Sequence, residues 1–369
     1  MKKLLWFILL LIIYGCQNTT QKVAKNNQEI PLNKISHTQS EKIYNRSKLF
    51  PNKTQLSIAI IENGQSSFYG VLIENDKVLS VENRDNVFEI GSITKIFTST
   101  LLSGLVIENK VELDDYINKY LKFQLKENQK ITFKQLANHT SGLPGIPPNS
   151  DIELKENLRN PNPYKNYDEQ KLIEYLSQTM ELGDRKMSYS NLGAALLGYT
   201  LSKIENKSYE LLLQERVFSK YDMINSTTDR CQIKNKLIKG LDENGNVTPN
   251  SDLAIHVGAG GILSTTEDLA KFAIAQFNSV NKELALTRQK TFTIDENQDI
   301  GLGWGIIKNK SKGNWYSHFG ATGGYSSAMT IDPTNRNGVI ILSNVSYWNK
   351  NQSDIILLST ELLQTLLQK

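Results

Sequence analysis

The chain has 369 residues, of which 39% are hydrophobic, so it can bury a large core. Because single hydrophobic cores stop growing at about 250–300 residues, we expect two lobes. The formal net charge is +4, Lys2 and Lys3 supply two of these charges, and charges of both signs are interspersed. Nucleic-acid-binding proteins usually show a basic patch or stripe, so we expect no nucleic-acid partner.

The N-terminus, MKKLLWFILLLIIYGC, has the pattern of a secretion signal. Two lysines precede ten apolar residues, 4–13, and ten are too few to span a hydrocarbon core about 30 Å thick. We therefore predict a signal peptide over residues 1–15. Residues 13–16, IYGC, resemble the bacterial lipoprotein box, in which the cysteine is lipidated and becomes the new N-terminus.

This resemblance implies a lipid anchor on Cys16 and a place at the bacterial cell envelope, as a periplasmic or cell-surface lipoprotein. Simple secretion with an incidental cysteine is the alternative. If Cys16 carries lipid, Cys231 has no cysteine to pair with, so no disulfide framework is expected. Residues 16–45 are polar and lack apolar periodicity, which predicts a flexible tether, and the globular part follows as residues 46–369.

Two strands are predicted first in the globular part, QLSIAIIENG (55–64) and SSFYGVLIEND (66–76), around a turn at Asn63-Gly64. A strand-like segment and an apolar helix follow over residues 88–106, and the chain is then mostly helical over about 105–265. The next helix, after residue 263, opens with a predicted capping box of Ser264 and Glu267.

Short alternating segments separated by turn residues predict strands again in the last third of the chain, and an amphipathic helix closes it over 351–369. Strands at both ends with helices between them predict an α/β (α+β) fold. We expect one antiparallel sheet, built from both chain ends and flanked by helices, with an inserted, mostly helical lobe.

Several kinds of chemistry are excluded by missing motifs. The sequence contains no Gly-Lys pair, so a phosphate-binding Walker A loop is absent. The glycine runs at 258–261 and 301–305 miss the dinucleotide-binding spacing, and Gly-x-Ser-x-Gly does not occur. The four histidines are far apart along the chain and offer no metal pair at helical spacing. We expect neither a cofactor nor a metal.

A Ser-x-x-Lys motif is the candidate for nucleophilic chemistry. It occurs twice, at Ser92 and Ser279, so the spacing alone carries little information. Ser279 lies in a polar stretch, whereas Ser92 follows the strand-like FEIG and opens an apolar helix that also carries Lys95. Either Ser92 is a nucleophile with its base one turn away, or it caps a helix that carries an ordinary surface lysine.

Five blocks of sequence favour the nucleophile over the helix cap as the role of Ser92. They are FEIGSITKIFTSTLLSGLV (88–106), ITFKQLANHTSGLP (131–144), MSYSNLGAALLGY (187–199), GAGGILSTTEDLAKF (258–272) and HFGATGGYSSAMTIDP (318–333). In this order they resemble consecutive blocks of the class C β-lactamase and DD-peptidase superfamily, over most of residues 55–345. The HTSGLP part of the second block is interpreted as scaffold.

The resemblance implies acyl transfer, with Ser92 as the nucleophile, Lys95 as its base and Tyr189 passing the proton to the leaving group. Asn191 would orient the substrate amide. At its ordinary pKa of about 10.4, Lys95 would be protonated at neutral pH, so burial has to lower that pKa. The strand after His318 would place Gly320 and Ala321 at the substrate, and the backbone N–H groups of Ser92 and Ala321 would form the oxyanion hole.

One block departs from the family. Class C β-lactamases have Lys-Thr-Gly where this chain has His318-Phe319-Gly320. Histidine is common there in DD-peptidases and esterase-like relatives, and a partly charged His318 would be a weaker carboxylate partner than lysine. Phe319 lacks the hydroxyl that helps to bind a substrate carboxylate. The expected function is a serine hydrolase of peptides, such as D-Ala peptides, or of small esters. A class C-like β-lactamase and a non-hydrolytic penicillin-binding sensor remain as alternatives.

Overall fold

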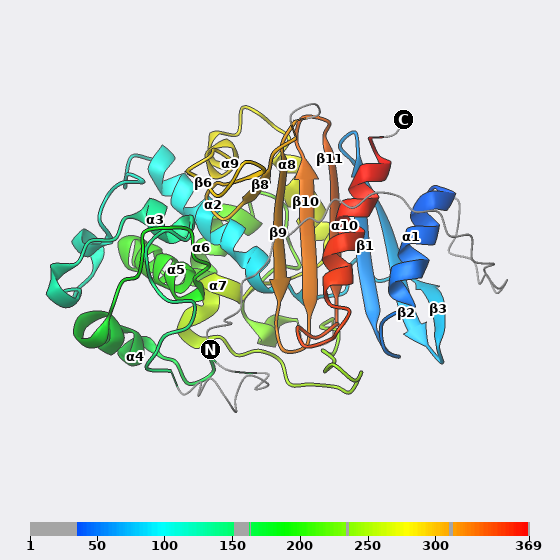
Figure 1. Ribbon diagram of the computed structural model, residues 1–369, viewed down its shortest axis with the longest axis horizontal. Helices are drawn as coiled ribbons and strands as arrows, with labels where there is room; N and C mark the ends of the chain where they lie inside the picture. The colour runs from blue at the N-terminus through cyan, green and yellow to red at the C-terminus, as the bar shows by residue number, and fades with distance from the viewer. Residues whose placement is uncertain (1–34, 151–161, 163, 234–235, 310–312, 368–369) are drawn as a thin grey trace.

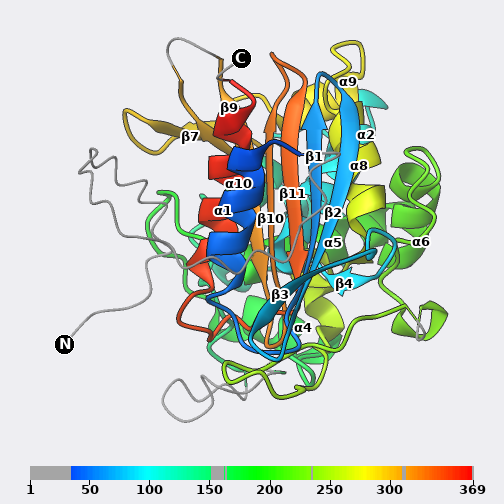
Figure 2. The same cartoon turned by 90° about the vertical axis from the view of Figure 1, so that its right-hand side faces the viewer.

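The computed structural model describes residues 35–150, 162, 164–233, 236–309 and 313–367. The expected signal peptide, Cys16 and most of the expected tether lie outside the described residues. A large sheet lies between a pair of helices on one face and a larger helical lobe on the other (Figure 2). Within the described ranges, no helix is long and apolar enough to cross a bilayer.

The sheet unites the two ends of the chain. In the described part its strand order is β3-β2-β1-β11-β10-β9-β8-β7-β6, and the neighbouring strands are antiparallel. The strands are β1 (Gln55–Glu62), β2 (Gln65–Glu74), β3 (Lys77–Val81), β6 (Phe292–Thr293), β7 (Gln298–Ile300), β8 (Gly305–Ile307), β9 (Trp315–Ala321), β10 (Ser326–Asp332) and β11 (Asn337–Ser343). N-terminal β1 pairs with C-terminal β11, so the predicted sheet of both chain ends is confirmed.

A second, two-stranded sheet pairs β4 (Phe88–Glu89) with β5 (Leu263–Ser264). The predicted hairpin between β1 and β2 is also confirmed. Asn63 and Gly64 form its turn with φ values of 52° and 81°, and these left-handed values suit asparagine and glycine in a two-residue hairpin turn.

The helices form two groups around the sheet (Figure 1). They are α1 (His37–Ser47), α2 (Thr94–Ile107), α3 (Phe133–Ala137), α4 (Glu169–Glu174), α5 (Asn191–Glu205), α6 (Tyr209–Leu213), α7 (Val257–Gly260), α8 (Thr266–Ala275), α9 (Lys282–Thr287) and α10 (Ser353–Thr365). α1 and α10 cover one face of the sheet, and α2, α5 and α8 lie on the other side (Figure 2). Short 3-10 turns complete the framework of the site, notably η1 (Gly91–Ile93) just before α2 and η7 (Ala254–His256) just before α7.

Helix α1 corrects the predicted tether, which was expected to run to residue 45. Ser36 caps this helix in a capping box with Gln39, Ile43 is fully buried, and Arg46 forms ion pairs with Asp354 and Glu361 around α10. These partners lie more than 300 residues away in sequence. The polar residues of α1 are ordered because helix α10 packs beside them. The local sequence of α1 does not reveal this contact.

The start of α8 also differs from prediction by one residue. Thr265, not Ser264, is the N-cap, and its hydroxyl accepts the backbone N–H of Asp268 at 3.1 Å. Ser264 belongs instead to β5, paired with Phe88. The β4–β5 strand pair therefore includes Ser264, the residue that the capping-box pattern in the sequence assigns to the helix cap.

Candidate active site

The candidate nucleophile lies on a tight turn between a strand and a helix. After β4 the chain enters η1, where Gly91 has a φ of +51°. A Cβ at Gly91 would lie 2.6 Å from the backbone nitrogen of Ala321, so only glycine allows the end of β9 to approach this closely. Ser92 follows, half-buried, at the entrance to α2.

Lys95 lies directly beneath Ser92. Its side chain is only 2% exposed, and its Nζ is 3.0 Å from Ser92 Oγ, 2.8 Å from Asn191 Oδ1 and 2.7 Å from the Ala259 carbonyl oxygen. Burial without a carboxylate partner lowers the pKa of Lys95 well below 10.5. A neutral amine has two N–H groups for the amide and carbonyl oxygens, which leaves its lone pair for the Ser92 hydroxyl proton.

Tyr189 and Asn191 reach the same point from the start of α5. Ser190 is the N-cap of this helix, and its hydroxyl accepts the N–H of Gly193 at 2.8 Å. Tyr189 hydrogen-bonds to Ser92, and burial raises the pKa of the phenol above its ordinary value of 10.0. The Lys95 Nζ is 4.8 Å from the centre of its ring. Tyr189 is therefore a protonated phenol at neutral pH, suited to donating a proton.

The end of β9 forms the opposite wall. The Thr322 N–H donates to the Tyr325 carbonyl at 2.9 Å, and hydrogen-bonded pairs alternate in an antiparallel ladder, so the Ala321 N–H points away from β10. On that side β8 pairs only with Trp315, Tyr316 and Ser317. The Ala321 N–H thus faces η1, next to the backbone of Gly91.

Gly320 brings this strand against the nucleophile. A Cβ there would lie 2.0 Å from the Ile90 carbonyl oxygen and 2.9 Å from the Ser92 backbone nitrogen. The backbone N–H groups of Ser92 and Ala321 consequently lie on two segments in close contact. Such a pair of donors is suited to holding an oxyanion.

His318 lies on the site side of β9 but is not charged at neutral pH. Its Nδ1 is 2.8 Å from the Phe319 carbonyl oxygen, an acceptor, so Nδ1 carries the proton and Nε2 is an acceptor. Burial, together with the nearby Lys95, lowers the pKa of His318 to about 3. Contrary to the expectation of a partly charged histidine, the lowered pKa keeps this half-buried ring neutral at pH 7.

Phe319 does not line the space above Ser92, contrary to expectation. Successive side chains of a strand point to opposite faces. His318 and Gly320 point toward the helical lobe, whereas the Phe319 ring packs against the apolar cluster on the α1 and α10 face of the sheet. The missing hydroxyl at this position therefore carries no weight in the choice of substrate.

His139 belongs to the site although HTSGLP was interpreted as scaffold. Its ring centre is 4.5 Å from that of Tyr189, and its Nδ1 accepts the Ser190 N–H at 3.2 Å. Burial lowers the pKa of His139 well below 6.5, so a neutral ring supports Tyr189. With His318 at 6.3 Å, two neutral imidazoles flank the phenol.

A third histidine supports Asn191. His256 stacks on Tyr164 with ring centres 4.3 Å apart, and the Tyr164 hydroxyl accepts from Asn191 Nδ2 at 3.2 Å. His139, His256 and His318 are more than 60 residues apart along the chain, so no local signal connects them. The structure thus places Ser92, Lys95, Tyr189, Asn191, His318, Gly320 and Ala321 together, and Cys16 lies outside the described residues.

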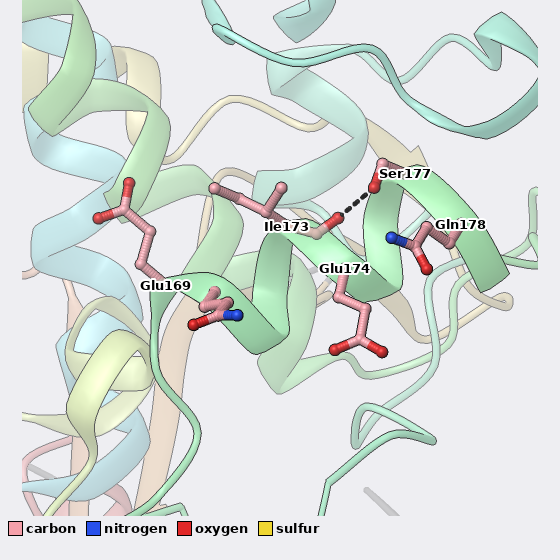
Figure 3. Close-up of a pocket in the computed structure, with 6 residues that line it drawn as sticks. Glu169, Ile173, Glu174, Ser177 and Gln178 are labelled. Carbon is pink, nitrogen blue, oxygen red and sulfur yellow. Dashed lines mark hydrogen bonds between the residues drawn. The ribbon is translucent and has the colours of Figure 1, made fainter.

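A hollow on α4 has no comparable chemistry. Its volume is about 480 Å³, and Glu169, Ile173, Glu174, Ser177 and Gln178 surround it (Figure 3). The Ser177 hydroxyl donates to the Ile173 carbonyl at 2.7 Å, and Glu169 is ion-paired with Lys203. We assign no reaction to this hollow.

Three curated relatives are similar in sequence to this chain. A beta-lactamase of Pseudomonas fluorescens is 25% identical over 80% of this chain and 89% of its own length. Beta-lactamase-like protein 2 of Dictyostelium discoideum is 28% identical over 72% of this chain, and protein flp of Staphylococcus aureus strain MW2 is 26% identical over 79%. The chain spans 50% and 59%, respectively, of these last two proteins.

Solved structures share the fold. A class C beta lactamase from Rhodobacter sphaeroides superposes with a TM-score of 0.74 at 18% identity, over 90% of this chain and 100% of its own. A beta-lactamase/D-alanine carboxypeptidase from Yersinia pestis gives 0.70 at 24% identity, over 89% and 96%. The sequence profile of the beta-lactamase family matches residues 52–362. This chain, with Ser92 in η1 and the buried Lys95 in the first turn of α2, belongs to the beta-lactamase family.

Proposed function

We propose that this protein is a serine hydrolase that forms an acyl-enzyme at Ser92 with amide or ester substrates. The observation that carries the proposal is the buried Lys95 amine, 3.0 Å from Ser92 Oγ, with a pKa lowered by burial. A serine hydroxyl is a poor nucleophile without a base, and a neutral amine in hydrogen-bond contact is such a base.

The first half of the reaction follows from the contacts. The Lys95 lone pair takes the proton from Ser92 Oγ, and Oγ forms a bond to the substrate carbonyl carbon. The carbonyl oxygen becomes an oxyanion, held by the N–H groups of Ser92 and Ala321. Tyr189 donates its proton to the leaving group as the bond to that group breaks, and Lys95 returns a proton to Tyr189. Asn191 would bind the substrate amide in addition to its contacts with Lys95 and Tyr164.

The second half releases the acid. Water takes the place of the leaving group and gives a proton to the neutral Lys95 amine while its oxygen attacks the acyl carbon. Collapse of the second oxyanion breaks the bond to Ser92 Oγ, which recovers its proton. Ser92, Lys95 and Tyr189 thus end in their starting protonation states, and a proton from water replaces the one that departs with the leaving group.

The substrate class follows from the charge at the site. Neutral His318 gives no cation beside the scissile bond, where class C β-lactamases have lysine. A carboxylate entering there loses water without gaining a charged partner, whereas an uncharged ester does not. Small esters, and peptides without a carboxylate next to the scissile bond, are therefore the proposed substrates, ahead of penicillins. The family and the fold are equally compatible with a class C-like β-lactamase, which is the alternative, and a non-hydrolytic penicillin-binding sensor is a third.

Intact-mass spectrometry tests the proposal. Exposure to a fluorophosphonate is expected to add one phosphonyl group to the wild type and to Ser279→Ala, but none to Ser92→Ala. Ser279 is the matched control because it heads the second Ser-x-x-Lys motif, in an exposed turn. Full labelling of Ser92→Ala would exclude this nucleophile. Parallel exposure to nitrophenyl butyrate and nitrocefin ranks the substrate classes, and faster nitrocefin turnover would favour the β-lactamase.

We further propose that Cys16 anchors the protein to a bacterial membrane through lipid, which rests on the IYGC pattern. Cys16→Ser is expected to move the protein from the membrane fraction to the soluble fraction. Cys231→Ser is the control, since Cys231 is exposed and lies in the described domain. A wild type found in the soluble fraction of cells would contradict the anchor.

A further inference from the structure

A half-buried arginine without an acidic partner lies on the site face of the sheet, beyond the reactive centre. Arg288 is the C-cap of α9, and its guanidinium lies 5.6 Å from the centre of the Tyr316 ring. Among the described residues its guanidinium has no ion-pair or hydrogen-bond partner, and its Nε is buried without an acceptor. Stacking on tyrosine satisfies none of the five guanidinium N–H groups.

This arginine lines a cavity of about 370 Å³ between the end of α9 and strands β7, β8 and β9. Figure 1 shows α9 close to β8 at this end of the molecule. The cavity has one acidic residue, Asp299, whose Oδ1 is 2.9 Å from Lys308 Nζ. Asp299 also interacts electrostatically with the exposed Lys290, so Arg288 is the cation in the cavity wall that has no described acidic partner. A cation held partly out of water is stabilised by an anion that it can bind directly.

The position of the cavity relates it to one part of the substrate. Tyr316 and His318 lie on the same face of β9, so they are roughly 7 Å apart along the strand. The oxyanion of the acyl group would lie at Ala321. The proton donor for the leaving group, Tyr189, lies near His318. The line from acyl group to leaving group therefore runs along β9 toward Tyr316. The cavity consequently lies on the leaving-group side.

We propose that this cavity is a carboxylate-binding subsite, in which Arg288 holds an acidic group on the distal part of the leaving group. The inference rests on the proposed acyl transfer at Ser92. The span from Ala321 to Tyr316 is about 16–17 Å at the usual rise per residue. A leaving group of one amino acid is too short to cover it, whereas four peptide-like units of about 3.5 Å each cover about 14 Å and leave the remainder to the arginine side chain.

Thioesters with matched leaving groups test the subsite. S-benzoyl-mercaptoacetyl-triglycine and its C-terminal amide form the long pair, and S-benzoyl-mercaptoacetate and its amide form the short pair. Thiol release gives kcat/KM for each. The wild type is expected to prefer the long acid over the long amide by about tenfold or more, as for a hydrogen bond to a charged group. No such preference is expected in the short pair.

Variants assign the preference to the arginine. Arg288→Gln is expected to bring the long acid-to-amide ratio close to one, and Arg288→Lys to retain part of it. Lys282→Gln removes a charge from the other end of α9, outside the cavity wall, and is expected to keep the wild-type ratio. An unchanged ratio in Arg288→Gln, or no preference in the wild type, would overturn the subsite and show that Arg288 only packs on Tyr316.

A binding measurement separates this inference from the proposed function. If the wild type releases no thiol from any of these thioesters, the proposed hydrolysis fails on its own account. Calorimetry with Ser92→Ala then compares binding of the long acid and the long amide. Tighter binding of the acid that disappears in the Ser92→Ala, Arg288→Gln double variant supports the subsite, and equal binding of acid and amide contradicts it.

Discussion

Replacing Lys95 with methionine is expected to slow acylation of Ser92 by about 10²- to 10⁴-fold, the usual contribution of a general base. Methionine is similar in length and suits a buried position, but it cannot take the hydroxyl proton 3.0 Å away. The measurement is the rate of acyl-enzyme formation with nitrophenyl acetate, followed by intact mass. Lys282→Met, in the second Ser-x-x-Lys motif, is the control and should acylate like the wild type.

The same lysine predicts a pH dependence. Only the neutral amine accepts a proton, and burial lowers the pKa of Lys95 below 10.5. Acylation by the wild type should therefore rise with pH through this lowered pKa and level off before pH 10.5. The sign for stability is the same: between the folded and unfolded pKa values the unfolded chain binds more protons, so Lys95 makes folding more favourable as pH rises. Equal acylation rates in Lys95→Met and the wild type would exclude Lys95 as the base.

Replacing Gly320 with alanine is expected to remove most activity while the protein still folds. The added Cβ would lie 2.0 Å from the Ile90 carbonyl oxygen and 2.5 Å from Ser327 Oγ, so β9 has to move away from η1. Loss of one oxyanion donor typically costs about 10²–10³ in rate. Overpacking typically lowers the free energy of unfolding by about 1–3 kcal/mol. Acylation rate and urea unfolding measure the two effects.

Gly104→Ala is the matched control for this substitution. Gly104 lies within α2, and a Cβ there would have no atom within 4 Å. Alanine favours helix over glycine by about 0.8–1 kcal/mol, so this variant should be at least as stable as the wild type and equally active. Full activity in Gly320→Ala would show that β9 does not supply the oxyanion site at this spacing.

The sequence by itself determined the elements and the residue types of the site. Alternating apolar residues around Asn63-Gly64 predict the first hairpin, because strand period and turn chemistry are local properties. The order of the five blocks identified the family, and these blocks contain Ser92, Lys95 and Tyr189. Sequence reasoning also required a buried Lys95, since an ordinary lysine is protonated at neutral pH.

Only the tertiary structure decided how these residues are surrounded. The order in residues 37–45 comes from Asp354 and Glu361 on the last helix. His139 and His318 both lie near Tyr189 although 179 residues separate them, and their neutral state comes from burial. These properties depend on which distant segments meet and how much water they exclude. The direction of the Phe319 ring does not depend on excluded water. It depends on which face of β9 lies against η1. A linear pattern contains none of these contacts, and so the charge of the site was decided only in the folded chain.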